Sequence, residues 1–189
     1  LQKHIETNCV QAGYTPGSGQ PRQIPIIQST TFKYDTCEAM GQLFDLEAEG
    51  YFYSGLQNPT CDMVAAKICA LEGGTAAMLT SSGQAANFFA LFNLTSNGDH
   101  IVASSSIYGG TFNLLRHTLP RDGITTTFVS AENPQEFEDA IQENTKLVYF
   151  ETFGNPNADL PDFEAITAIA HKHHLPVIVD NTFATPVNC

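Results

Sequence analysis

The pattern of apolar and polar positions changes at about residue 61. From there on, segments with apolar residues at helical spacing alternate with short, nearly continuous apolar runs, which are typical of buried strands. The predicted helices are 61–72, 83–96, 111–119, 134–144 and 162–174, and the predicted strands are 75–82, 101–106, 125–130, 146–152 and 176–181. This alternation predicts an α/β fold with a mostly parallel sheet flanked by helices.

The first sixty residues show little periodicity. They contain Gly, Pro and Ser clusters such as TPGSGQPRQIP at 15–25, and we predict only one short helix there, near 36–48. A segment of this kind cannot bury itself. We therefore expect an extended N-terminal arm, residues 1–60, that lies on its own core or on a neighbouring subunit, and an α/β domain, residues 61–189.

Composition narrows the partners and the compartment. Twenty acidic and eight basic residues give a net charge of -12, which argues against nucleic-acid and anionic-membrane partners because these need basic patches. No apolar run approaches the roughly 20 residues that cross a bilayer, and the first residues lack the apolar stretch of a signal peptide. The five cysteines are scattered, so we expect free thiols in a reducing cytoplasm.

A metal site is not predicted. His171 and His174 have a spacing that could share a metal ion, but no carboxylate or cysteine of matching spacing accompanies them. We expect a solvated helix end, where the nearby cation Lys172 suits the helix dipole.

Polar turns follow four of the predicted strands. The turns contain Gly83-Gln84, Tyr108, Asn155 and Asp180. Because the carboxyl ends of parallel strands meet at one edge of a sheet, we expect these residues to converge on one crevice.

Each turn taken alone has a functional and a structural interpretation. Gly83-Gln84 is either a phosphate cradle at a helix start or a tight turn, and it matches neither a Walker loop nor a GxGxxG motif. Tyr108 either offers its ring and hydroxyl to a ligand or packs at a turn. Asp180 either pairs with a cation, such as a protonated ring nitrogen, or caps a helix.

Five motifs in order resemble the Cys/Met-metabolism enzymes, which are fold-type I enzymes that use pyridoxal 5′-phosphate (PLP). They are YFYSGLQNPT (51–60), LTSSGQAA (79–86), SSIYGGTF (105–112), ETFGNPN (151–157) and VDNTFATP (179–186). The resemblance covers nearly the whole chain. It implies that residues 61–189 are the PLP-binding large domain of a fold-type I transferase, incomplete here, and that the C-terminal small domain of the family is absent.

The resemblance also implies roles for individual residues around the cofactor. Gly83 and Gln84 match the backbone donors to the PLP phosphate. Tyr108 matches the tyrosine that stacks on the pyridine ring and assists proton transfer, which makes it the candidate catalytic residue. Asn155 matches an asparagine near the phenolic oxygen of PLP. Asp180 matches the aspartate that pairs with the pyridinium nitrogen.

Two further residues complete the implied cofactor set. Thr182 lies where the family places a residue close to the ring, and Tyr53 matches a tyrosine that reaches the phosphate of a neighbouring subunit. Two chains build each active site in this family. The resemblance therefore implies a homo-oligomer, a tetramer made as a dimer of active dimers, in which the N-terminal arm contacts the neighbouring subunit.

Two departures from the family pattern bear on cofactor binding. Gly55 stands where the family usually has an arginine that clamps the phosphate, and its loss should weaken cofactor binding by about a few kcal/mol. The Schiff-base lysine of the family follows the aspartate by a few tens of residues, but every lysine in this chain precedes Asp180.

The resemblance narrows the reaction to sulfur amino-acid metabolism. The wording of SSIYGGTFNLL and NTFATPVNC is most similar to O-acetylhomoserine sulfhydrylases, which implies a γ-replacement with sulfide or a thiol that gives homocysteine or methionine. Methionine γ-lyase is the nearest alternative, although it typically carries cysteine where this chain has Gly110. Cystathionine γ-synthase and cystathionine lyase are further alternatives. From another class, a non-catalytic fragment that retains the PLP-binding fold also accounts for Gly55 and the missing lysine.

Overall fold

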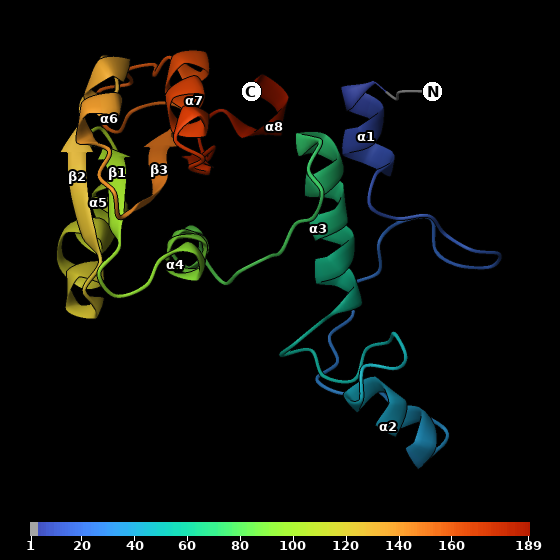
Figure 1. Cartoon of the computed structure of the whole chain (residues 1–189). Coiled ribbons are helices and arrows are strands. Elements are labelled where there is room, and N and C mark those ends of the chain that lie inside the picture. The colour runs from blue at the N-terminus through green and yellow to red at the C-terminus, as the bar shows by residue number, and fades with distance from the viewer. Residues whose placement is uncertain (1–3) are drawn as a thin grey trace. The chain divides into compact units, whose positions relative to one another are not determined.

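The chain forms two compact units in a computed structural model that describes residues 4–189 (Figure 1). The N-terminal unit ends at Leu79 and the C-terminal unit runs from Thr80 to Cys189. Residues 1–3, which belong to the predicted arm, lie outside the described residues. The division into an arm up to residue 60 and a PLP-binding domain after it stays a prediction.

Three helices form the framework of the described N-terminal unit: α1 (Ile5–Gln11), α2 (Cys37–Phe44) and α3 (Pro59–Glu72). The predictions near 36–48 and at 61–72 are confirmed by α2 and α3. The third helix begins early because the side chain of Asn58 accepts the Thr60 N–H at 2.9 Å, and proline is tolerated at the first helical position.

The first helix escaped prediction because IETNCVQ is too short to display helical spacing. Such a helix is marginal alone and depends on packing. It lies on α3, where Lys67 Nζ donates to the carbonyl oxygens of Cys9 at 3.0 Å and Val10 at 3.3 Å. The lysine thereby satisfies two carbonyls at the end of α1 that have no partner within the helix.

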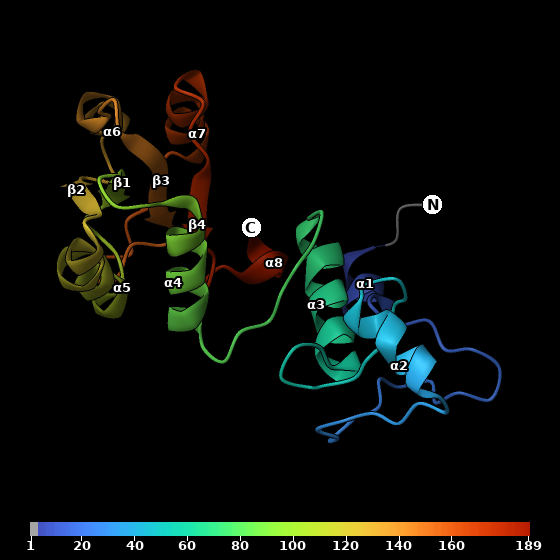
Figure 2. The same cartoon turned by 60° about the horizontal axis from the view of Figure 1, so that its bottom comes forward.

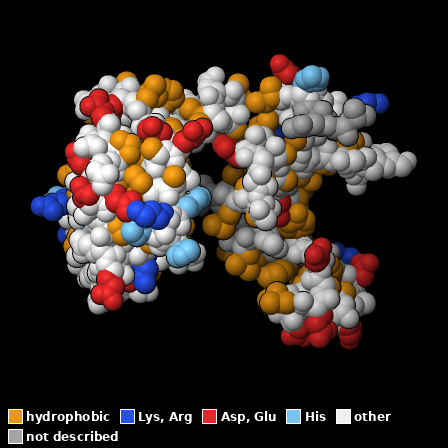
Figure 3. Space-filling model, turned by 45° about the horizontal axis from the view of Figure 1, so that its top comes forward, with side chains coloured by type: hydrophobic (Ala, Val, Ile, Leu, Met, Phe, Trp, Pro, Cys, Tyr) orange, Lys and Arg blue, Asp and Glu red, His pale blue; other side chains and the backbone are white. Residues whose placement is uncertain are grey.

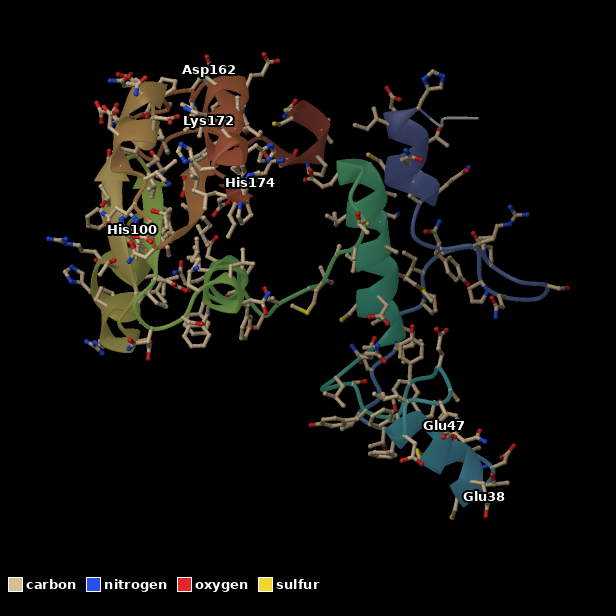
Figure 4. The ribbon with its side chains drawn as sticks, in the orientation of Figure 1. Glu38, Glu47, His100, Asp162, Lys172 and His174 are labelled. Atoms are coloured by element: carbon tan, nitrogen blue, oxygen red, sulfur yellow. The ribbon has the colours of Figure 1, made fainter. Side chains whose placement is uncertain are left out.

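Acidic side chains gather around α2 in the N-terminal unit (Figure 3). Glu38 and Glu47 extend from this segment (Figure 4), and Thr36 caps the helix by accepting the Ala39 N–H at 3.1 Å. An acid in the first turn, such as Glu38, suits the positive end of the helix dipole. Like charges would repel an anionic partner from this surface.

A parallel sheet organises the C-terminal unit. Its strands within residues 80–189 are β1 (His100–Ser104), β2 (Thr125–Val129), β3 (Thr145–Glu151) and β4 (Val177–Asp180), in the order β2-β1-β3-β4. Each neighbouring pair is parallel, and Glu151 at the end of β3 lies beside Asp180 at the end of β4. The strands predicted at 101–106, 125–130, 146–152 and 176–181 are confirmed.

Helices cover both faces of this sheet (Figure 2). Those on one face are α4 (Gly83–Leu94) and α5 (Gly109–Asn113), and those on the other are α6 (Pro134–Ala140) and α7 (Phe163–Lys172). A four-residue helix, α8 (Thr185–Asn188), follows β4. Each predicted helix from 83 onward therefore has a counterpart, and the α/β architecture with a mostly parallel sheet is confirmed.

Alternate residues of the central strands supply two separate cores. Ile101 and Tyr149 point to the side of α4 and α5, where they join Leu91, while Val102 and Phe150 point to the side of α6 and α7. All of these side chains are fully buried. Both faces of β1 and β3 are thus apolar, which explains their nearly continuous apolar runs.

The helix predicted at 111–119 changes type along its length. It starts as α5, widens to a π-helix over Leu114–Thr118 and tightens to a 3-10 helix over Leu119–Asp122. Pro120 has no N–H to donate to the carbonyl one turn back, so the regular ladder cannot continue. The Leu119 N–H bonds to the Leu114 carbonyl instead, five residues back, which is the π-helical spacing.

The strand predicted at 75–82 is wrong. The segment 75–82 has no regular secondary structure, and Met78 within it is 76% exposed. A strand needs a neighbour that completes its hydrogen-bond ladder, and no described residue pairs with this segment. The apolar content of TAAMLTSS does not replace that partner.

The basic end of α7 binds an acid of α6. Glu138 Oε1 accepts from Lys172 Nζ and from His173 Nε2, each at 2.8 Å, and these bonds hold the pKa of the Glu138 carboxyl below its usual range. Figure 4 shows Asp162 and His174 at opposite ends of α7. Across residues 4–189, no group of three or more His, Cys, Asp or Glu side chains could hold a metal ion. Nor does any helix in this range have the length and apolar content to cross a membrane.

A buried histidine on β1 makes stability depend on pH. His100 is 1% exposed, and its ring nitrogens lie 2.8 Å from the hydroxyls of Thr145 and Thr127. Burial lowers its pKa because the charged ring loses its hydration. The unfolded chain therefore binds a proton at a higher pH than the folded chain does.

We expect the free energy of unfolding to fall as the pH drops below about 6.5, the ordinary pKa of histidine, and to continue falling down to the lowered folded pKa. Urea unfolding between about pH 7.5 and pH 5.5 measures this slope. His100→Gln keeps a polar amide between the two threonines but cannot titrate, so its slope should be shallower. Parallel pH curves for the variant and the wild type would contradict this assignment.

Candidate functional site

A cavity of about 410 Å³ opens at the carboxyl ends of β3 and β4, beside the start of α4. All of its lining residues belong to the C-terminal unit. They are Gly83, Gln84, Asn87, Tyr108, Glu151, Phe153, Asn155, Asp180, Thr182 and Phe183. Six of the seven residues predicted to hold the cofactor are in this set, so the structure brings them together as the sheet argument anticipated.

The floor of the cavity is the carboxylate of Asp180. Its Oδ2 accepts from Asn87 Nδ2 at 3.1 Å and lies 3.4 Å from the Tyr149 hydroxyl. Its Oδ1 accepts from the Thr182 backbone N–H at 3.1 Å and from the Thr182 hydroxyl. Several donors on different elements thus hold one carboxylate in one orientation.

Asn87 is a site residue that the sequence reasoning missed. It is 9% exposed, and its amide bridges Asp180 to the Thr111 hydroxyl at 3.2 Å and to the Tyr149 hydroxyl at 3.2 Å. The available signal was a single polar residue on the buried side of an apolar helix, GQAANFFALFNL. Such a residue needs a partner, since burying an unpaired amide costs free energy.

The Tyr149 hydroxyl, which comes from β3, also contacts the Asp180 carboxylate at the floor of the cavity. The tyrosine is fully buried, and its burial together with the nearby Asp180 carboxylate strongly raises its pKa. The phenol therefore stays neutral and keeps its proton available for Asn87 or Asp180.

The first turn of α4 offers backbone donors to the cavity. Ser82 caps this helix by accepting the Ala85 N–H at 3.0 Å, and the N–H groups of Gly83 and Gln84 in the first turn have no partner inside the helix. A Cβ added at Gly83 would meet no atom within 4 Å. The opening at this helix start, with its positive dipole end, suits an anionic group such as a phosphate.

Tyr108 lies at the mouth of the cavity, directly before α5. The residue is 55% exposed, and its backbone N–H donates to Glu151 Oε1 at 2.7 Å. The ring lies against the Cα of Gly110, since a Cβ on that residue would overlap ring atoms of Tyr108. The glycine therefore permits this position of the ring.

The loop that carries Asn155 is hydrogen-bonded to Ser106, in the turn that follows β1. The Ser106 hydroxyl donates to Asp159 Oδ1 at 2.7 Å, the Gly154 N–H donates to the Asp159 carbonyl at 2.9 Å, and the Asn155 N–H donates to the Ser106 carbonyl at 3.2 Å. A Cβ at Gly154 would overlap both the Ser106 hydroxyl and the Asp159 carboxylate. Glycine is thus required for the loop to hold Asn155 at the cavity.

Glu151 is a second acid in the cavity wall. It is 7% exposed, and burial followed by the neighbouring Asp180 charge raises the pKa of its carboxyl, while the bond from the Tyr108 N–H opposes this. Glu151 begins the motif ETFGNPN, and no role was predicted for it from the sequence.

Tyr53 and Gly55 lie in the N-terminal unit. Tyr53 is 47% exposed and forms an isolated antiparallel bridge with Thr31. A Cβ at Gly55 would overlap the Tyr53 ring, so an arginine at this position would have to displace that ring. The predicted role of Tyr53 at the phosphate of a neighbouring subunit stays a prediction.

The arrangement has the chemistry for a flat, polar ring that carries an anion at one end and a cationic nitrogen at the other. The start of α4 suits the anion, Asp180 suits the cation, and the Tyr108 ring offers an aromatic face. Asp180 lines the cavity, and hydrogen bonds fix the position of its carboxylate. These properties fit PLP.

The family model described as Cys/Met metabolism PLP-dependent enzyme matches residues 6–189. The chain is 47% identical over 186 residues to a homocysteine/cysteine synthase of Saccharomyces cerevisiae, which covers 97% of this chain and 42% of that protein. It is 48% identical over 190 residues to an L-methionine γ-lyase of Porphyromonas gingivalis, covering 100% of this chain and 48% of that protein.

A solved structure shares the fold. A Campylobacter jejuni protein assigned as an O-acetylhomoserine (thiol)-lyase superposes with a TM-score of 0.91 at 36% identity, covering 98% of this chain and 46% of that one. That structure contains N′-pyridoxyl-lysine-5′-monophosphate. The chain spans less than half the length of each of these relatives.

We expect Gly154→Ala to lower the free energy of unfolding by roughly 1–3 kcal/mol, because the added methyl group must push apart Ser106 and Asp159. Thermal and urea unfolding of the protein that carries this chain measure the change. Gly109→Ala is the matched control, since a Cβ there meets nothing within 4 Å. Equal stability of the two variants would show that the loop around Asn155 is not held as described.

Proposed function

The chain belongs to the Cys/Met metabolism family of PLP-dependent enzymes, and we propose that the protein that carries it catalyses a γ-replacement on O-acetylhomoserine. Sulfide or a thiol would enter as acetate leaves, and the product would be homocysteine or methionine. The relatives named homocysteine/cysteine synthase and O-acetylhomoserine (thiol)-lyase support this reaction. The substrates are small molecules.

The single observation that carries the proposal is the convergence of six predicted cofactor residues on one cavity of about 410 Å³. They come from three separate turns and from the start of α4, at positions as distant in the chain as Gly83 and Thr182. Chance would not gather a helix start, an aromatic ring and an oriented carboxylate around one cavity of cofactor size.

Each residue has a task that its surroundings support. The N–H groups of Gly83 and Gln84 would bind the phosphate, and Asp180 would hold a proton on the ring nitrogen. Asn155 would lie near the phenolic oxygen, and Thr182 would lie close to the ring. When bound, PLP acts as an electron sink for the amino-acid substrate, which allows a group on Cγ to leave.

Tyr108 would act as the catalytic residue. Its exposed ring would cover one face of the pyridine ring and so exclude water from that side. Its hydroxyl would hold or pass a proton near the substrate. The absence of a side chain at Gly110 allows the ring to lie in this position.

Assembly completes the proposed site. Tyr53 would reach the phosphate in a neighbouring subunit, and the arm of residues 1–60 would lie on that subunit, within a dimer of active dimers in the cytoplasm. The lysine that binds PLP would come from a segment outside these 189 residues, as every lysine here precedes Asp180. The pyridoxyl-lysine of the Campylobacter jejuni relative supports this part of the proposal.

A second candidate reaction is the elimination of methanethiol from methionine, which the similarity to the Porphyromonas gingivalis L-methionine γ-lyase favours. Gly110 favours the replacement reaction, since cysteine is typical of the lyases at this position and any side chain there would displace the Tyr108 ring. Cystathionine γ-synthase and cystathionine lyase chemistry, or a non-catalytic PLP-binding fragment, are further alternatives that the same assays distinguish.

The protein that carries this chain should bind PLP and, after borohydride reduction, retain a pyridoxyl group that mass spectrometry detects. With O-acetylhomoserine and sulfide it should release acetate and homocysteine. Methionine alone should yield methanethiol at least about tenfold more slowly, a difference of roughly 1.4 kcal/mol in barrier height. Faster release of methanethiol would favour the lyase, and a protein that bound no PLP would refute the proposal altogether.

A further inference from the structure

Burying the Glu151 carboxyl costs free energy, and none of the proposed roles uses this side chain. It is 7% exposed, and it sits beside Asp180 on the neighbouring strand, where two carboxylates repel one another. Asp180 is held by Asn87, Tyr149 and Thr182, whereas the hydrogen bond that the described residues give to Glu151 is the one from the Tyr108 N–H. A buried acid of this kind is a candidate functional residue.

Besides its bond to Glu151, the Tyr108 backbone makes a hydrogen bond through its carbonyl oxygen, which accepts the Phe112 N–H at 2.9 Å. Tyr108 precedes α5 without a side-chain cap, and the next two residues are glycines, which bring no side chain to pack. On the other side, Ile107 is buried and anchors the chain. The bond of 2.7 Å to Glu151 therefore ties the tyrosine to the end of β3, which is a rigid element.

We propose that Glu151 is a positioning residue: its side-chain oxygen fixes the backbone of Tyr108 and so holds the tyrosine ring over the cavity where PLP binds. The inference rests on the proposed function, since the ring matters only when it stacks on a cofactor. A charge-assisted bond to a backbone N–H is short and directional, which suits it to this task. Burying Glu151 beside Asp180 costs free energy in the folded protein. In return, the cavity is shaped for PLP before PLP binds.

Two substitutions separate the hydrogen bond from the charge. Glu151→Gln keeps an oxygen that can accept the Tyr108 N–H, and Glu151→Ala removes it. Glu136→Ala is a matched control, because Glu136 Oε2 likewise accepts a backbone N–H, that of Ser130, at 2.9 Å, but does not line the cavity.

The experiment measures the dissociation constant of PLP for the apo form of the protein that carries this chain, together with the induced circular dichroism of the bound pyridoxal chromophore. Glu151→Ala should weaken PLP binding about threefold to tenfold, the range expected for a misplaced aromatic stack, and should reduce the dichroic band. Glu151→Gln should restore both. Glu136→Ala should unfold more easily than the wild type yet bind PLP equally well.

A double-mutant cycle tests whether Glu151 acts through Tyr108. In a Tyr108→Ala background, the ring is gone and Glu151→Ala should no longer change PLP affinity. An effect that persists in that background would overturn the inference, as would a Glu151→Ala variant that binds PLP like the wild type. Thermal unfolding of each apo variant confirms that it is folded. If the wild type itself bound no PLP, the proposed function would fail instead, so the two failures are distinguishable.

Discussion

The polar groups of the cavity are arranged around one carboxylate, that of Asp180. Asp180 ends β4 with both oxygens engaged, by Asn87 from α4, by Tyr149 from β3 and by Thr182 from the turn that follows. Each donor comes from an element whose position depends on the parallel sheet. These donors satisfy the carboxylate oxygens in place of water and fix their orientation beside the cavity.

The sheet makes this arrangement possible by being covered on both faces. Apolar side chains on alternate positions of β1 and β3 secure α4 and α5 on one side and α6 and α7 on the other. The carboxyl ends of the strands remain uncovered, so the polar turns collect there. Glu151, next to Asp180 in register, then connects the floor of the cavity to the tyrosine at its mouth. The residues that we expect to bind the cofactor thus lie at strand ends that the fold itself brings together.

Local patterns in the sequence predicted most of the C-terminal unit. The strands near 101–106 and 146–152 and the helix near 83–96 follow from spacing alone, and the polar turns at Tyr108 and Asp180 follow from where strands end. The segment at 75–82 was mispredicted because a strand depends on a partner that no local pattern reveals. Asn87 was missed because its contact with Asp180 joins residues 93 positions apart. The tasks of the cavity residues came from family resemblance, which spacing could not supply.

The protonation state of the PLP ring nitrogen tests the central claim, that Asp180 is oriented to hold a cation in this cavity. With PLP labelled at that nitrogen with ¹⁵N and bound to the protein that carries this chain, the account predicts the chemical shift of a protonated pyridinium. Asp180→Asn should move the shift toward that of a neutral pyridine. Asp162→Asn, which alters an acid that caps α7 by accepting the Ala165 N–H at 3.0 Å, should leave it unchanged. A neutral nitrogen in the wild type, or a shift indifferent to Asp180→Asn, would contradict the account.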